Sequence, residues 1–204
     1  MNIVGLGSAG CKIAKEFENY SQYKTFFIDT ENKEGFGNFL KVEKCANHEE
    51  YEAKYKDLDL RKIAGETTLI TAGTGKITGI LLRLLEQFKN QKLTVLYIKP
   101  DMSTSSEDAV LRENIVFGVL QQYTRSNLFS GLCVISNIAV EAVLEKVSIA
   151  NYWNSLNKVI SSTYHMLNVY ENTEPLLSTL GEPKETSKIS TLGVVAYKSL
   201  DEKI

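Results

Sequence analysis

The stretch that decides the fold is Ala72-Gly73-Thr74-Gly75-Lys76-Ile77-Thr78-Gly79. The apolar run Thr67–Ile70 before it is typical of a buried strand, and the run Ile80–Leu85 after it is typical of an amphipathic helix. Three glycines between the two runs free the backbone to turn tightly. The N–H groups of such a turn, together with the positive end of the helix dipole, form an anion site.

A second turn of the same kind opens the chain, Gly5-Leu6-Gly7-Ser8-Ala9-Gly10. It follows a strand predicted over residues 2–5 and precedes a helix predicted over Cys11–Asn19. The next predicted strand, Thr25–Ile28, ends at Asp29. Two glycine-rich turns in one short chain predict two walls around a single phosphate-bearing ligand.

The rest of the chain continues the alternation of strands and helices. Further strands are predicted at Phe39–Val42, Thr67–Ala72, Thr94–Ile98, Leu132–Ile135 and Ile189–Tyr197, and helices at His48–Tyr55, Ile77–Asn90, Glu107–Tyr123, Ile138–Leu144 and Ala150–Val169. This order predicts an α/β fold, three-layer and doubly wound, with a mainly parallel sheet and a long helix near the C-terminus. We expect a nucleotide-binding domain over 1–170, including the long helix, and a C-terminal tail over 171–204 with a final strand.

Composition limits the classes of function. The chain has 204 residues, 43% of them apolar, and a net charge of −2, so nothing indicates bulk attraction to nucleic acid or anionic lipid. Three scattered cysteines form neither a disulfide framework nor a metal site, which favours a reducing compartment. The sequence shows no secretory signal and no apolar run long enough for a membrane span. We therefore expect a soluble, cytoplasmic protein that contacts neither membrane nor nucleic acid directly.

The glycine turns allow other interpretations. Gly5-x-Gly7-x-x-Gly10, with Asp29 19 residues further on at the end of the next strand, also fits a dinucleotide-binding oxidoreductase. That interpretation leaves the second turn unexplained, and neither His48 nor His165 has an evident partner for hydride transfer. A Walker-type phosphate loop would need glycine at position 70 and serine or threonine at position 77, and both positions are isoleucine.

A third interpretation comes from resemblance to the tubulin/FtsZ family. The first glycine turn resembles the first phosphate loop of FtsZ, and Ile28-Asp29-Thr30-Glu31 resembles its Asn-Thr-Asp segment. Ala72-Gly73-Thr74-Gly75 resembles the tubulin signature Gly-Gly-Gly-Thr-Gly-Ser/Thr-Gly, although Lys76 stands where a small residue is usual. Lys12 likewise replaces an asparagine that is frequent in FtsZ.

Later motifs follow in the order of the family, over roughly residues 1–170. Tyr97-Ile98-Lys99-Pro100 is similar to the Thr-Lys-Pro of FtsZ, and Val134-Ile135-Ser136-Asn137 to the Ile-Pro-Asn whose asparagine touches guanine. Trp153 and Asn157 have the spacing of the aromatic residue and the base-reading Asn or Asp at the start of the central helix. The resemblance thus implies GTP or GDP as ligand, with Mg²⁺ as its companion ion.

The resemblance implies one set of nucleotide-binding residues: Gly5, Gly7, Ser8, Ala9, Gly10, Cys11, Asp29, Ala72, Gly73, Thr74, Gly75, Lys76, Pro100, Asn137, Trp153 and Asn157. Ordinary structural roles compete with these assignments. The glycines also suit close packing of strand on helix, Asn137 a helix cap, and Trp153 a core or interface aromatic. Asn157 is a poor helix former in mid-helix, which favours a functional role, since its amide offers both donor and acceptor to a base.

The chain departs from the family at its C-terminal end. It is too short for the second domain that follows the central helix in tubulin and FtsZ, and the catalytic Asn-x-Asp-x-x-Asp loop is degenerate. Glu171 and Glu174 each stand one residue late and would act only in trans, in the site of a neighbouring copy. The resemblance therefore implies head-to-tail self-association near Thr173–Lys188 and weak or trans-dependent GTP hydrolysis. The alternative is a nucleotide-free scaffold that kept the fold and lost the ligand.

Overall fold

The computed structural model describes residues 1–103, 105–144, 148–174 and 188–193. Its centre is a seven-stranded sheet in the order β3-β2-β1-β4-β5-β6-β7, with every neighbouring pair parallel. The strands are β1 (Asn2–Leu6), β2 (Lys24–Asp29), β3 (Phe39–Lys41), β4 (Thr67–Ala72), β5 (Leu93–Lys99), β6 (Gly131–Ser136) and β7 (Ile189–Thr191).

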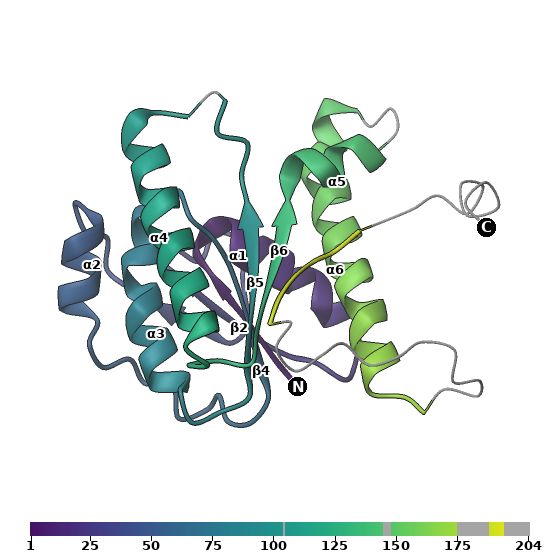
Figure 1. The fold of residues 1–204 in the computed structure, drawn as a ribbon, viewed down its shortest axis with the longest axis horizontal. Helices are drawn as coiled ribbons and strands as arrows, with labels where there is room; N and C mark the ends of the chain where they lie inside the picture. The colour runs from purple at the N-terminus through teal and green to yellow at the C-terminus, as the bar shows by residue number, and fades with distance from the viewer. Residues whose placement is uncertain (104, 145–147, 175–187, 194–204) are drawn as a thin grey trace.

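Helices cover both faces of this sheet, giving three layers (Figure 1). The helices α2 (His48–Lys54), α3 (Leu81–Phe88) and α4 (Glu107–Arg125) lie on one face, and α1 (Gly7–Glu16), α5 (Asn137–Val143) and α6 (Tyr152–Glu171) on the other. Short 3₁₀ turns occupy Phe17–Asn19, Lys76–Ile80 and Ile149–Asn151. The fold is thus the predicted doubly wound α/β architecture with a long helix, α6, near the C-terminus.

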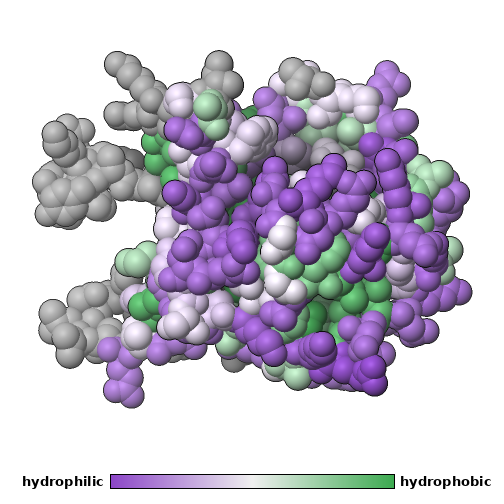
Figure 2. Space-filling model, turned by 180° about the vertical axis from the view of Figure 1, so that it is seen from behind, coloured by the Kyte–Doolittle hydropathy of each residue, from purple (hydrophilic) through white to green (hydrophobic). Residues whose placement is uncertain are grey.

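Each face of the sheet packs a separate apolar core against its helix layer. Leu69, Val95 and Leu84 belong to the core beneath α2, α3 and α4, whereas Ile70, Leu96 and Ile160 belong to the core beneath α1 and α6. Burial on both faces explains why the central strands read as continuous apolar runs. Seen from behind, the outer surface is largely hydrophilic, with an apolar area on one side (Figure 2). No helix in the described ranges is both long and apolar enough to cross a bilayer.

Several predicted boundaries are wrong. α1 begins at Gly7 rather than Cys11, because the chain passes from strand to helix without an intervening loop. The predicted helix Ile77–Asn90 is a 3₁₀ turn at Lys76–Ile80 followed by α3, since Gly79 lies against the backbone of α2 at His48. The final strand is observed at Ile189–Thr191, and its predicted continuation over 194–197 lies outside the described residues, as does most of the tail, 175–187.

Candidate nucleotide site

The two glycine turns lie side by side at the point where the strand order reverses. β1 and β4 pair in parallel, with Val4 opposite Leu69, and the turns follow their carboxyl ends. β2 continues the sheet from β1 on one side, and β5 continues it from β4 on the other. A crevice at such a switch point is where open α/β sheets bind ligands.

The first turn presents backbone donors. Leu6 precedes α1 and supplies no side-chain cap, whereas Asn47, Ser106 and Ser136 cap α2, α4 and α5. Ser8 and Ala9, the second and third residues of the helix, are exposed. Because the first N–H groups of a helix have no partner inside it, those of α1 are free to bind an anion.

The glycines of the first turn have distinct roles. A Cβ on Gly5 would lie 2.6 Å from both the Cα of Cys11 and the carbonyl oxygen of Gly10, and one on Gly10 would fall on the carbonyl oxygen of Ile70. These two glycines let α1 lie directly on the sheet, as the packing interpretation expects. Gly7 has a φ of +71°, a conformation that side chains disfavour. The motif therefore combines close packing with a special turn.

The second turn is held from behind by α4 and β5. A Cβ on Gly73 would fall on the hydroxyl of Tyr97 and lie 3.1 Å from the Cα of Glu113. The Tyr97 hydroxyl donates to Glu113 Oε1 at 3.3 Å, and burial raises the pKa of that hydroxyl above its ordinary value. Arg112 Nε donates to the carbonyl oxygen of Thr74 at 3.0 Å. The turn is thus positioned by contacts that no local sequence pattern indicates.

The two turns touch each other. Ile77 Cγ2 lies 2.9 Å from the position of a Cβ on Gly7, so its side chain rests against the first turn. Lys76 Nζ donates to the carbonyl oxygen of Ala46 at 2.7 Å. Thr74 is half-buried and Gly75 exposed, so the crest of the second turn reaches the surface.

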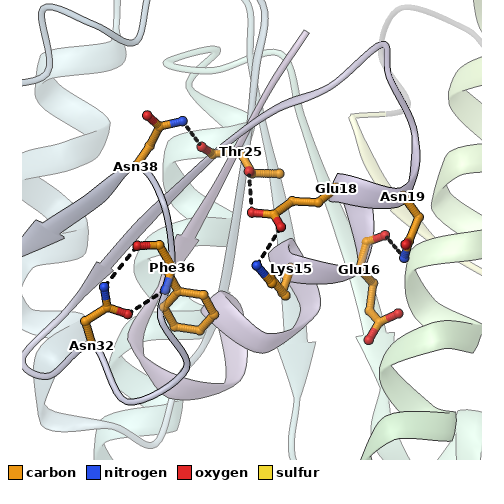
Figure 3. A network of polar contacts seen from close by, with 8 residues as sticks. All are labelled: Lys15, Glu16, Glu18, Asn19, Thr25, Asn32, Phe36 and Asn38. Atoms are coloured by element: carbon orange, nitrogen blue, oxygen red, sulfur yellow. Dashed lines mark hydrogen bonds and ion pairs between the residues drawn. The ribbon is translucent and has the colours of Figure 1, made fainter.

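A cavity of about 440 Å³ opens beside the start of α1. Its lining is mostly charged: Ser8, Lys12, Asp29, Thr30, Glu31, Lys33, Glu34, Phe36 and Lys44. Asp29 accepts a hydrogen bond from the Thr30 N–H at 2.7 Å, and burial raises the pKa of its carboxyl. The loop over this cavity is closed by Asn32, whose side chain bonds both the N–H and the carbonyl of Phe36 (Figure 3).

The residues predicted to contact the base follow β6 and begin α6. Ser136, not Asn137, caps α5, because Ser136 Oγ accepts from the N–H of Ala139 at 3.4 Å. Asn137 Oδ1 is instead buried without a hydrogen-bond partner within the described chain. A buried polar oxygen left without a partner is costly. The capping interpretation of Asn137 is therefore wrong.

Trp153 and Asn157 lie one turn apart in α6, as predicted. Trp153 is 61% exposed, and its ring meets that of Tyr152 edge-on, at 5.1 Å between ring centroids. Asn157 is 8% exposed, and its amide forms no hydrogen bond among the described residues. An exposed ring beside an unpaired amide suits a flat polar ligand better than it suits a core. Pro100 is half-buried after β5.

Cys11 belongs to the apolar core beneath α1 and α6. Its side chain is fully buried, and Sγ donates to the carbonyl of Gly5 at 3.3 Å. Burial raises the pKa of the thiol to about 12, so it stays protonated at neutral pH. Any contribution of Cys11 to a ligand would come from its backbone.

The predicted acids lie at the far end of α6. Glu171 is the last residue of the helix and Glu174 follows it, and both are exposed. Glu171 is 18 residues beyond Trp153, which at 1.5 Å per residue is about 27 Å along the axis. These carboxylates cannot reach the glycine turns of their own chain.

Comparisons with known proteins identify the fold. Neither a protein-family model nor a curated protein matches the sequence. Among solved structures, an empty FtsZ dimer from M. jannaschii has a TM-score of 0.66 at 14% identity, covering 87% of this chain and 56% of that one. CetZ2 from Haloferax volcanii, a GTPgS-bound protofilament, has a TM-score of 0.66 at 13% identity, covering 87% and 60%. The chain thus spans less than two thirds of each, and it has the fold of the tubulin/FtsZ nucleotide-binding domain.

Proposed function

We propose that this protein binds a guanine nucleotide in the crevice between the carboxyl ends of β1 and β4. The observation that carries the proposal is the adjacency of the two turns, one with the uncapped N-terminus of α1 and the other with the exposed residues Gly75 and Lys76 at its crest. The phosphates would accept hydrogen bonds from the N–H groups of both turns. Lys12 and Lys76 would offset phosphate charge only after leaving their present partners, Glu34 and the carbonyl oxygen of Ala46.

The base would lie toward α6. Trp153 offers a face for stacking, and the side-chain amides of Asn137 and Asn157, which form no hydrogen bond among the described residues, offer an acceptor and donors to the guanine edge. Binding would give Asn137 Oδ1 the partner it lacks within the described chain. Mg²⁺ would be held chiefly by the phosphates, since it keeps several waters and few protein ligands in such sites.

Hydrolysis would depend on a second copy. Glu171 is about 27 Å along α6 from Trp153, and Glu174 lies beyond the end of the helix, so only a head-to-tail neighbour could bring these acids to a nucleotide. The two similar structures are described as a dimer and a protofilament, which supports such an arrangement. Part of the expected contact, 175–187, lies outside the described residues. Three free thiols support a reducing, cytoplasmic location.

A nucleotide-free scaffold is the second candidate, and Ile77 favours it. Its side chain rests on Gly7, so an apolar group stands between the two turns where phosphate oxygens would be expected. Lys76 is also bound to the carbonyl of Ala46 and would have to leave it to reach a ligand. A scaffold protein with this fold would bind partners through its surface and would need no nucleotide.

Thermal unfolding with GTP, GDP, ATP or NAD at millimolar concentration, with Mg²⁺ present, tests the proposal. A ligand at about 100 times its dissociation constant adds roughly 2.7 kcal/mol. For a chain of this size that corresponds to a shift of roughly 5–11 °C. We expect the shift with GTP and GDP only. A shift with NAD alone would indicate the dinucleotide interpretation, and no shift with any nucleotide would favour the scaffold.

Asparagine variants test the base contacts. Asn137→Ala and Asn157→Ala should each weaken GDP binding about tenfold in titration calorimetry, the equivalent of about 1.4 kcal/mol. Asn154→Ala is the matched control, because Asn154 is exposed on the same helix. Unchanged affinity in either variant would remove that residue from the site.

A further inference from the structure

The outer face of α4 carries apolar side chains that the chain does not cover. Leu111 is 59% and Ile115 50% exposed. At 100° per residue, Leu111, Ile115, Gly118 and Gln122 fall within about 60° of one another. Val116, Leu120 and Thr124, on the opposite side of the helix, are buried. α4 lies at the front of its helix layer, where this outer face is accessible (Figure 1).

Gly118 lies in the middle of this face, and no contact among the described residues requires a glycine at this position. A Cβ at this position would meet nothing within 4 Å. Glycine inside a helix is less favourable than alanine, and neither a turn nor a positive φ requires it here. A glycine between exposed apolar side chains allows the backbone of another helix to approach closely, as at helix crossings lined with small residues.

The charges of α4 select the orientation of such a partner. Glu107 and Asp108 occupy its first turn and Arg125 its last. A second copy of α4 running antiparallel would bring opposite charges together at both ends, and its dipole would oppose the first. A parallel copy would bring like charges together.

We propose that α4 is a self-association surface, and that two copies of this protein pair through it antiparallel about a two-fold axis near residues 116 and 117. This register places Ile115 of one copy over Gly118 of the other. It also places Glu107 of one copy beside Arg125 of the other, because these two residues are five full turns apart and lie on the same flank of the face. The contact is isologous and closes at two copies, unlike a head-to-tail contact. It does not depend on nucleotide binding.

Sedimentation equilibrium without nucleotide tests the proposal over a wide range of protein concentration. One helix face per copy is small against a standard interface of about 1,600 Å², so we expect a reversible, concentration-dependent dimer. Ile115→Glu should raise the dissociation constant at least tenfold. Met166→Glu is the matched control, since Met166 is 65% exposed on α6, in the other helix layer. Wild-type protein that stays monomeric, or that forms larger species without a dimer, would overturn the proposal.

Two further variants separate this contact from loss of folding. Gly118→Leu adds bulk in open space and removes a helix-disfavouring glycine, so the melting temperature should not fall while dimerisation falls at least tenfold. Glu107→Arg and Arg125→Glu should each weaken the dimer, and the double variant should restore it to within about threefold, as antiparallel pairing requires. If Gly118→Leu leaves the dissociation constant of the dimer unchanged, or if the double charge exchange does not restore it, the proposed register is excluded.

Discussion

Gly5→Ala is the most direct test of how the first turn is built. Gly5 lies within β1, a central strand, and the start of α1 folds back over it. The added Cβ would lie 2.6 Å from the Cα of Cys11 and 2.6 Å from the carbonyl oxygen of Gly10. Carbon atoms in contact are about 3.5–4.0 Å apart, so α1 must move off the strand by about 1 Å.

The expected loss of stability follows from the nature of the clashing atoms. Overpacking in a core costs about 1–3 kcal/mol. Both neighbours here are backbone atoms, which no change of rotamer can relieve, so we expect a loss near 3 kcal/mol. For a chain of this length the melting temperature should fall by roughly 6–12 °C. A displacement of 1 Å also misaligns the N–H groups of α1, and we expect GDP affinity to fall at least tenfold.

Urea unfolding followed by circular dichroism measures the first effect, and calorimetry with GDP measures the second. Gly37→Ala is the matched control, because a Cβ at this exposed loop position would meet nothing within 4 Å. Its stability should stay within about 0.5 kcal/mol of the wild type. A loss of less than about 0.5 kcal/mol in Gly5→Ala, with an unchanged slope in urea, would refute the packing argument.

Two other predictions concern the supports of the second turn. Burial lowers the pKa of His48 below its ordinary 6.5, so the stability gained from the neutral imidazole is complete above about pH 6.5 and is lost as the pH falls. Unfolding free energies measured from pH 7 to 5 should therefore fall less steeply for His48→Gln than for the wild type, and parallel curves would contradict this. Tyr97→Phe removes the hydroxyl that donates to buried Glu113 and should cost about 1–3 kcal/mol in urea unfolding. Tyr123→Phe, whose hydroxyl has no hydrogen bond in the described ranges, should change stability by less than about 0.5 kcal/mol, and equal losses in both variants would contradict the role of Glu113.

Element type was predictable wherever the pattern is local. The short strand at Phe39–Lys41 and the helix at His48–Lys54 follow the predicted positions closely. Element ends were less predictable, because a contact distant in sequence decides them. Gly79 lies against the backbone of His48, 31 residues earlier, and the chain there forms a 3₁₀ turn that periodicity does not indicate.

The candidate site was likewise predictable where its pattern is local and unpredictable where contacts distant in sequence decide it. The glycine turns and the spacing of Trp153 and Asn157 were visible in the sequence, whereas Arg112 was not. Arg112 reaches the carbonyl of Thr74, 38 residues away, and nothing in its own helix marks it as a support of that turn. The capping role that competed with a guanine contact for Asn137 belongs to its neighbour Ser136, a difference of one residue that only the backbone geometry of α5 resolves.

The sequence by itself determined the alternation of buried strands and amphipathic helices, and the positions of the two glycine turns, because burial patterns and glycine act within a few residues. Only the tertiary structure decided that β1 pairs with β4, across more than 60 residues, and so that the two turns lie side by side. Strand order depends on hydrogen bonds and packing between segments far apart in the chain. No local pattern encodes which carboxyl ends will meet.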